Sequence, residues 1–229
     1  RLSGVQKSID GRTRMELRRL EEQEHQKTRK LWEEVFSDDT RAFLDYYYFI
    51  KTKENEIWVI EEDGEIQSML QLNPYQLQVA EHPFLCRYII AVATRAQYRS
   101  RGYMSSLLRK AMQEMYGKKE PFTFLMPAAE AIYTPYDFRF VYSQRQAVFE
   151  KKAETELIEE EDATMFQAEE LAAFAKERLF GTARVYAVRD AHYYQTRVLE
   201  QQSENGGIRM LKKDGKLVGI YCYAKEETC

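Results

Sequence analysis

The 229-residue sequence predicts a mixed α/β domain that ends near residue 150, followed by a second, incomplete copy of its opening elements. Three observations predict this fold class. Two helical segments precede an Asp-Gly turn between β-prone runs, and a buried strand then enters a loop and a helix. The two helices and the Asp-Gly turn recur after an acidic stretch, which indicates a tandem duplication.

Residues 16–24 can open a first strand. Residues 25–36 place apolar side chains at i, i+4 spacing, as in an amphipathic helix. Ser37 and Asp38 are good N-cap residues and predict that a second, aromatic-rich helix begins there. Asp63-Gly64 lies between two β-prone runs and predicts a β-hairpin.

The next elements lead into and out of a cationic loop. Residues 88–94 predict a buried strand, and an apolar helical stripe follows Gly102 until Gly117, which we expect to act as the C-cap. The remaining predictions are a short strand in 121–128, a turn or short helix in 129–136, and closing strands in 138–152.

The predicted organisation is a domain over residues 15–152, a solvated acidic linker over 153–162, and a second domain over 163–229. The second domain repeats two helices, one begun by Asp190, and a hairpin around Asp214-Gly215. Gly102 lies 38 residues beyond Gly64, and the same offset from Gly215 passes residue 229. We therefore expect the second copy to stop before its loop, in a chain that is part of something longer.

Composition excludes several classes of protein. A net charge of −3 gives no field that would attract nucleic acid. Cys86, Cys222 and Cys229 lack CxxC spacing, so neither a disulfide framework nor a metal site is expected. No apolar run has the length of a membrane span, and residues 1–14 lack a signal-peptide core. We expect a cytoplasmic protein with no metal, membrane or nucleic-acid partner, and residues 1–14 to be a disordered arm or a tag remnant.

The stretch RAQYRSRGYMSSLL, residues 95–108, is the strongest candidate for a site. A strand that enters a loop and then a helix presents free N–H groups and the positive end of the helix dipole, which suit phosphate. Gly102 lets the backbone approach a ligand, Arg99 and Arg101 add charge, and Ser105 or Ser106 could cap the helix. A P-loop would need a GK[ST] ending. The alternative is an ordinary capped helix with solvated arginines.

This stretch resembles the acetyl-coenzyme A loop of the GCN5-related N-acetyltransferase (GNAT) superfamily, [QR]-x-x-G-x-[GA]. The segment is Arg99-Ser100-Arg101-Gly102-Tyr103-Met104, with Met104 in place of a small residue and Ser100 in place of a frequent second glycine. More narrowly, roughly residues 15–223 resemble the enhanced-intracellular-survival (Eis-like) acetyltransferases. These have tandem GNAT folds and a sterol-carrier-protein-like domain, which is missing here.

The resemblance implies direct transfer of an acetyl group from acetyl-coenzyme A to a primary amine, either of a small polycation such as an aminoglycoside or of a lysine. It also implies that the backbone of Val92, Ala93 and Thr94 binds the pantetheine arm. The pyrophosphate would sit on the N–H groups from Arg99 to Met104. A homo-oligomer is implied for the full-length form.

Tyr133, in AEAIYTPYDF, matches the general acid of the family, with Tyr136 as its rival. Glu130 is a weaker candidate for assisting the base. The narrower family uses its terminal carboxylate as the base, and Cys229 is not that terminus, so the base stays open. Helices like the one carrying Asp45 border the acceptor site in this family.

Two other functions stay open at this stage. Met104 and Ser100 depart from the loop signature, which favours a catalytically degenerate GNAT fold that serves as a binding or oligomerisation module. Similar tandem folds also transfer other acyl groups, or an amino acid onto a peptide.

Overall fold

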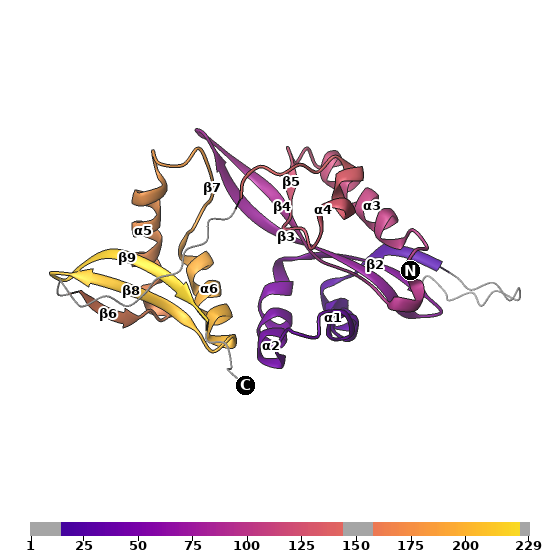
Figure 1. Ribbon diagram of the computed structural model, residues 1–229, viewed down its shortest axis with the longest axis horizontal. Helices are drawn as coiled ribbons and strands as arrows, with labels where there is room; N and C mark the ends of the chain where they lie inside the picture. The colour runs from indigo at the N-terminus through magenta and orange to yellow at the C-terminus, as the bar shows by residue number, and fades with distance from the viewer. Residues whose placement is uncertain (1–14, 144–157, 225–229) are drawn as a thin grey trace, which may run out of the picture.

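The computed structural model describes residues 15–143, the first region, and residues 158–224, the second region. The first region is built on a mixed sheet in the order β1-β2-β3-β4-β5, antiparallel except for the parallel pair β4–β5 (Figure 1). Its strands are β1 (Met15–Arg19), β2 (Glu56–Glu62), β3 (Glu65–Val79), β4 (His82–Thr94) and β5 (Thr123–Phe124). The predicted mixed α/β class is confirmed.

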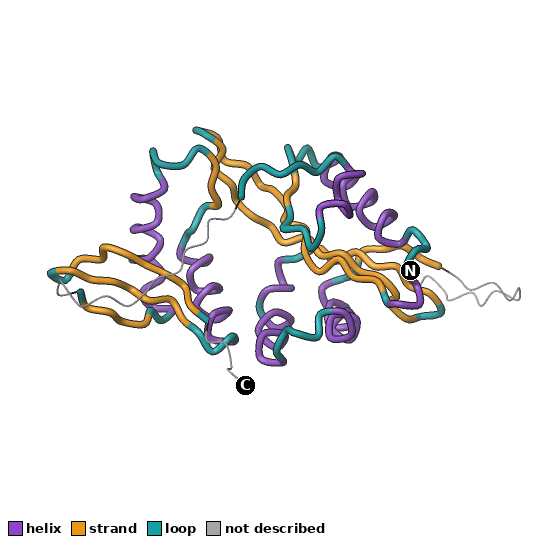
Figure 2. The backbone as a smooth tube through the Cα atoms, viewed as in Figure 1, coloured by secondary structure: helices purple, strands orange, loops and turns teal. Residues whose placement is uncertain are grey.

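Helices cover both faces of this sheet (Figure 2). On one face lie η1 (Glu22–Thr28), α1 (Arg29–Val35), α2 (Arg41–Phe49) and η2 (Lys51–Glu54). On the other lie α3 (Tyr103–Gly117) and α4 (Glu130–Tyr133), with η3 (Ala96–Tyr98) and η4 (Thr134–Tyr136) before and after them.

Strand alternation divides the first region into two apolar cores. Along β2, Val59 packs with Trp32 and the other residues of the α1–α2 face, whereas Trp58 packs with Leu107 and the α3 face. Both cores are closely packed around fully buried side chains. The sheet is therefore a fixed platform on which the strand ends and the following loops are positioned.

The two Asp-Gly turns fold as predicted and in the same way. Asp63 and Gly64 have φ of 53° and 82°, and Asp214 and Gly215 have φ of 51° and 72°. Positive φ at both central residues is the type I′ geometry that matches the twist of paired strands, and glycine adopts it without steric cost.

Two predicted helix ends differ from the structure. Helix α2 begins after Thr40, not at Ser37 or Asp38, because the Thr40 hydroxyl accepts from the Phe43 amide at 3.1 Å. Helix α3 does end at Gly117, but this residue is not a left-handed cap. Lys119, with φ of 60°, makes the turn instead.

Two further predictions need correction near the end of the first region. Residues 139–143 form no strand, and the rest of the predicted closing strands lies outside the described residues. The predicted acidic linker ends in a strand, β6 (Glu159–Asp162), whose side chains are exposed but whose backbone pairs with β8. The EEED run is therefore an edge strand with charged side chains, a common way to protect a free edge.

The second region contains a smaller sheet, β6-β8-β9, packed on two helices. Its elements are β6, η5 (Met165–Gln167), α5 (Ala168–Leu179), β7 (Val185–Ala187), α6 (Ala191–Ser203), β8 (Gly207–Lys213) and β9 (Lys216–Tyr223). The predicted cap of α6 is confirmed, since Asp190 accepts from the Tyr193 amide at 2.8 Å.

The two regions are joined by backbone pairing and by side chains. Strand β7 of the second region pairs antiparallel with β3 at Leu77–Val79, and α6 packs beside α2. His192 on α6 contacts the Glu54 carboxylate of η2. Among the residues that the structure describes, no helix has the length and apolar character needed to cross a membrane.

Candidate active site

Strands β4 and β5 stop pairing after Tyr88. They pair only at Arg87–Thr123 and Tyr88–Phe124, although β4 continues to Thr94. Within the described residues, no strand pairs with this edge of β4 beyond Tyr88. The backbone N–H and C=O groups of β4 on that edge are therefore available to a ligand, and the stretch includes the predicted Val92, Ala93 and Thr94.

A β-bulge lies inside this unpaired stretch. The β3–β4 register shifts between Met69–Ala93 and Gln71–Ile90, and Ala91 has a positive φ of 52°. The bulge changes the alternation, because both Ile90 and Ala91 pack toward the α1–α2 face while Val92 packs toward α3. A non-glycine residue held at positive φ is strained, and such strain is common at functional sites. No local sequence pattern predicts this bulge.

Arg95 fixes the start of the loop that follows β4. Its guanidinium contacts Glu34 of α1 at 2.9 Å and Glu65 of β3 at 2.8 Å, and its amide donates to the Gln67 carbonyl. The Arg95 side chain is only 10% exposed, so these ion pairs are held in place by packing. The cationic loop therefore leaves the sheet in a defined direction. No local sequence pattern predicts this role for Arg95.

The loop backbone turns twice through the left-handed region before α3 begins. Ser100 has φ of 63° and Gly102 has φ of 80°. An added Cβ at Gly102 would meet no protein atom, so it is the backbone angle that favours glycine here. Alternating conformations of this kind orient successive N–H groups toward one side, which suits an anion.

The N-terminus of α3 is not capped by a side chain. The prediction that Ser105 or Ser106 caps it is wrong, because Ser106 donates to the Gly102 carbonyl and Ser105 accepts from Arg109. The first-turn N–H groups, at Tyr103, Met104 and Ser105, consequently have no acceptor within the helix. They remain available for a phosphate, with the helix dipole favouring negative charge.

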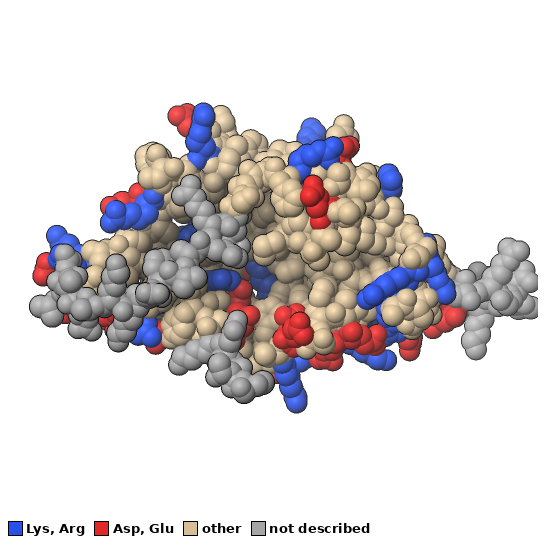
Figure 3. Space-filling model, viewed as in Figure 1, with Lys and Arg blue, Asp and Glu red and all other residues tan. Residues whose placement is uncertain are grey.

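The two predicted arginines differ in their contacts. Arg99 donates to the Thr94 carbonyl at 3.2 Å, which ties the loop to the end of β4. Arg101 stacks over the ring of Tyr98, at 4.7 Å from its centroid, and both arginines are exposed. Figure 3 shows basic side chains gathered near the start of α3, while acidic side chains gather over α1 and α2. The loop is thus the cationic end of the first region.

Tyr133 is half-buried on α4, on the α3 face of the sheet. Its ring meets Phe138 edge-on at 5.8 Å and packs on the apolar core beneath α3. Burial raises the pKa of the Tyr133 hydroxyl, and the neighbouring Tyr88 hydroxyl adds to the rise. Burial also raises the pKa of Tyr88, opposed by a hydrogen bond with the Met126 backbone. Tyr133 therefore stays protonated at neutral pH, beside the point where β4 and β5 separate.

The other candidates of α4 and η4 are less well placed. Tyr136 is half-buried under the Arg109 guanidinium, 5.5 Å from the ring centroid. Glu130 is exposed, and its backbone carbonyl accepts from the Thr134 hydroxyl. Tyr133 and Tyr136 both pack on the apolar core beneath α3, and of the two Tyr133 has its hydroxyl close enough to Tyr88 to be affected by it.

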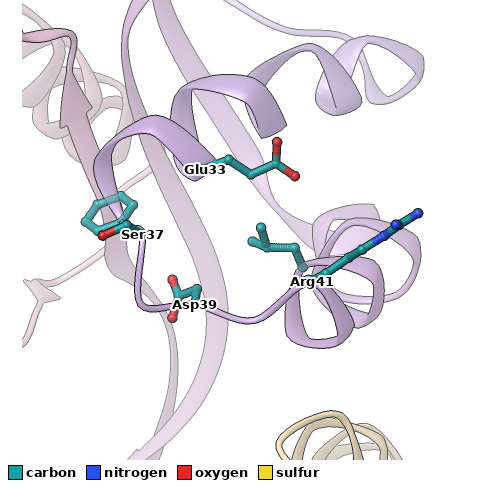
Figure 4. Close-up of a pocket in the computed structure, with 6 residues that line it drawn as sticks. Glu33, Ser37, Asp39 and Arg41 are labelled. Atoms are coloured by element: carbon teal, nitrogen blue, oxygen red, sulfur yellow. The ribbon is translucent and has the colours of Figure 1, made fainter.

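A surface depression of about 290 Å³ lies away from this loop, where α1 turns into α2 (Figure 4). It is lined by Glu33, Phe36, Ser37, Asp39, Arg41 and Leu44. Asp39 already accepts from the Trp32 indole at 2.7 Å, and Asp45 on α2 pairs with Arg29. These contacts tie α1 to α2, so the depression is a packing feature of that corner. In the described parts of the chain, no three His, Cys, Asp or Glu side chains gather as metal ligands would.

Comparison with known families identifies the chain. The acetyltransferase (GNAT) domain family matches residues 16–141, more than half of the sequence, and the chain belongs to this family. A search of curated protein sequences finds no match.

Solved structures show the same fold at low sequence identity. A probable N-acyltransferase from Enterococcus faecalis V583 aligns with a TM-score of 0.73 at 14% identity, covering 94% of this chain and 56% of its own. A GCN5-related N-acetyltransferase from Kribbella flavida gives 0.64 at 15% identity, covering 94% and 55%. A predicted acetyltransferase from Clostridium acetobutylicum, solved with acetyl-coenzyme A, gives 0.52 at 14%, covering 59% and 96%. The chain therefore spans little more than half the length of the first two.

Proposed function

We propose that this protein is an acetyl-coenzyme A-dependent N-acetyltransferase that acts on a primary amine by direct transfer. One observation carries the proposal. The unpaired, bulged end of β4 leads directly into a loop whose backbone enters an uncapped helix with Gly102 at φ of 80°. This arrangement offers an edge for an amide-containing arm, followed by a cradle for a pyrophosphate.

The binding step uses mainly backbone groups. Val92, Ala93 and Thr94 offer N–H and C=O groups to the pantetheine amides, as a further strand would. The N–H groups of the segment Arg99–Met104 receive the pyrophosphate, including those of Ser100, Arg101 and Tyr103. Met104 is half-buried, so its bulk lies partly within the helix packing and leaves its N–H in the first turn.

The transfer step then requires that the amine and the thioester are held close together and that one group donates a proton. The amine nitrogen attacks the thioester carbonyl carbon, a C–N bond forms, and the C–S bond breaks. The Tyr133 hydroxyl gives its proton to the departing thiolate, and the ammonium formed loses a proton to solvent or to a nearby carboxylate. Holding both reactants between β4 and β5 supplies much of the rate.

We further propose that the protein is an Eis-like acetyltransferase. The acceptor would be a small polycation such as an aminoglycoside, or a lysine side chain. The support for tandem folds is the recurrence of two helices and a type I′ Asp-Gly hairpin in the second region. We accordingly propose a GNAT domain over residues 15–152 and the start of a second over 163–229.

The test is thermal unfolding with acetyl-coenzyme A. We expect the ligand to raise the Tm of the wild type, and Gly102→Leu to abolish the rise. Gly215→Leu is the matched control, because Gly215 also has positive φ but lies in the second hairpin. It should lower the starting Tm and keep the ligand-induced rise.

No rise in the wild type at millimolar ligand would refute the function. A rise without release of coenzyme A in the presence of polyamines, aminoglycosides and lysine peptides would instead favour a degenerate GNAT fold that only binds.

A further inference from the structure

Three aromatic rings line the sheet at the point where β4 and β5 part. Tyr75 of β3 meets Tyr88 at 6.0 Å and Phe124 at 5.7 Å, and Tyr88 meets Phe124 at 5.3 Å. Tyr88 and Phe124 are the last pair of β4 and β5. Because Ile89 packs toward α3, Tyr88 faces the opposite side, toward α2 and the second region. We call these three rings the aromatic wall.

A lysine of the same chain lies on this wall. The Lys51 ammonium is 5.6 Å from the centroid of the Tyr75 ring, a cation–π contact. Lys51 begins η2, directly after α2, and its side chain is 17% exposed. Its ammonium is 3.8 Å from the Glu54 carboxylate, longer than a hydrogen bond. The amine is thus positioned by packing and is not held by a short ion pair with Glu54.

Two carboxylates, Glu54 and Glu200, lie near this amine. Glu200 on α6 is close enough for the Lys51 charge to act on it, while burial raises the pKa of Glu200. Arg197 pairs with one Glu200 oxygen at 2.5 Å. The Tyr46 hydroxyl, on a side chain only 8% exposed, faces Glu200 without a hydrogen bond of good geometry. Figure 3 shows a hollow between the two regions with acidic and basic side chains on its walls.

We propose that Lys51 is an acetylation site of this protein, modified by its own transfer site. The inference rests on the proposed function, which puts the thioester where β4 and β5 separate, at the end of the aromatic wall. The Lys51 nitrogen, once deprotonated, attacks the thioester carbonyl, forms an amide and releases coenzyme A thiolate. Two protons leave the Lys51 nitrogen. The first goes to Glu200, Glu54 or solvent before the attack, and the second is released as the amide forms while the thiolate takes up one proton, so the net products are the amide, coenzyme A and one proton.

Acetylation changes the junction between the two regions. It removes one positive charge from beside Glu54 and Glu200, and it replaces a cation on the Tyr75 ring by a neutral amide. Glu54 also contacts His192 on α6, and this contact bridges the two regions. After acetylation, the Lys51 ammonium no longer competes with His192 for the Glu54 carboxylate. The modified state is therefore distinguishable from the unmodified state by its charge and by its inter-region contacts.

The experiment is a time course of the full chain with acetyl-coenzyme A and no added amine, followed by peptide mass spectrometry. Lys53 is the matched control, since it lies two residues away in η2 and is exposed. We expect Lys51 to be acetylated at least about tenfold faster than Lys53, because proximity outweighs exposure. The rate constant should not change with protein concentration. Lys51→Arg should reduce the acceptor-independent release of coenzyme A to the slow rate contributed by the other lysines.

Two further measurements distinguish enzymatic acetylation from spontaneous acetylation. Excess coenzyme A, as a competitor, should slow Lys51 and leave Lys53 unchanged, and Gly102→Leu should do the same. Equal rates at Lys51 and Lys53 would overturn the inference, as would a Lys51 rate that the competitor does not affect. If added amines are acetylated while Lys51 is not, the inference fails and the function stands. If acetyl-coenzyme A does not bind, the function itself fails.

Discussion

The two regions share the same succession of helices and hairpin but differ in how the hairpin is paired and covered. Each has two helices followed by a hairpin with a type I′ Asp-Gly turn. In the first region the second hairpin strand, β3, pairs with β4 and β7 as well as β2, and the sheet is covered on both faces. In the second region β9 pairs only with β8 among the described residues, and no residue of β9 is buried.

The difference indicates that the proposed site lies outside the repeated unit. Helices and hairpin supply a platform in both regions, whereas the bulged strand, the cationic loop and the uncapped helix occur together only in the first region, as far as the described residues extend. A site of this kind should therefore respond to changes in the first region and tolerate equivalent changes in the second. Two predictions compare equivalent changes in the two regions, and two further predictions, with smaller expected effects, compare positions within the first region.

The first prediction compares a half-buried tyrosine of the first region, Tyr133, with a buried tyrosine of the second region, Tyr194. Tyr133→Phe should lower kcat by roughly 10²- to 10⁴-fold, because it removes the hydroxyl that we propose protonates the thiolate. The KM for acetyl-coenzyme A should stay unchanged. Tyr194→Phe, in the second region, removes a hydroxyl that is buried without a hydrogen-bond partner and should leave kcat unchanged. Steady-state kinetics with any productive amine measures both, and an equal loss in the two variants would remove the asymmetry.

The second prediction compares two fully buried leucines. Leu107→Ala under α3 and Leu171→Ala in α5 should each cost about 2–5 kcal/mol in the free energy of unfolding, since both leave a cavity. Only Leu107→Ala should also weaken acetyl-coenzyme A binding, because α3 carries the loop. Denaturant unfolding and ligand titration distinguish the two effects. Weakened binding in Leu171→Ala as well would mean that the regions act as one unit.

The third prediction uses the strained bulge. Ala91→Gly should raise the free energy of unfolding by about 1 kcal/mol or less, since glycine adopts a φ of 52° without a Cβ clash. Ala80→Gly, at a φ of 50° in the β3–β4 turn, should stabilise to a similar extent. We expect only Ala91→Gly to raise the KM for acetyl-coenzyme A, by a few-fold, because the bulge sets the free edge of β4. An unchanged KM would leave the bulge without a role in binding.

The fourth prediction concerns how the stability of the protein falls at acidic pH. Burial lowers the pKa of His25, opposed by its hydrogen bond to the Thr52 carbonyl, so the folded state binds this proton less readily than the unfolded chain. Stability should therefore fall as the pH drops below the unfolded pKa of about 6.5, and level off below the folded pKa. His25→Gln should flatten this slope, while His82→Gln, at the exposed start of β4, serves as control. Unfolding at a series of pH values gives the slope, and an unchanged slope in His25→Gln would refute the assignment.

The sequence predicted the fold well where the signals were local. Both Asp-Gly turns, the strand into residue 94, the helix from Tyr103 and the cap at Asp190 follow from turn chemistry, periodicity and capping. The errors at Ser37 and Gly117 have one cause, since several residues could end each helix and tertiary packing selected among them. The EEED strand was missed because its side chains carry no apolar pattern, whereas its backbone pairs with β8.

The candidate site was predictable in its loop but not in its surroundings. Gly102 and the arginines are visible as a cluster in the sequence. The bulge at Ala91, the Arg95 contacts and the aromatic wall join residues that lie far apart in the chain, so no local pattern reveals them. The roles of Val92–Thr94, Tyr133 and Glu130 stay predictions until the variants are measured.

The pairing of β7 with β3 has a consequence for how the chain can be divided. Strand β7 lies on β3 at Leu77–Val79, beyond the point where β2 stops, and so fills the free edge of a sheet that belongs to the other region. A cut between residues 143 and 158 would expose three strand residues with unpaired backbone on one fragment and leave the donated strand without a sheet on the other. The sheet of the first region therefore includes a strand that lies beyond the residues covered by the family match, and separate expression of either half should favour strand exchange between copies.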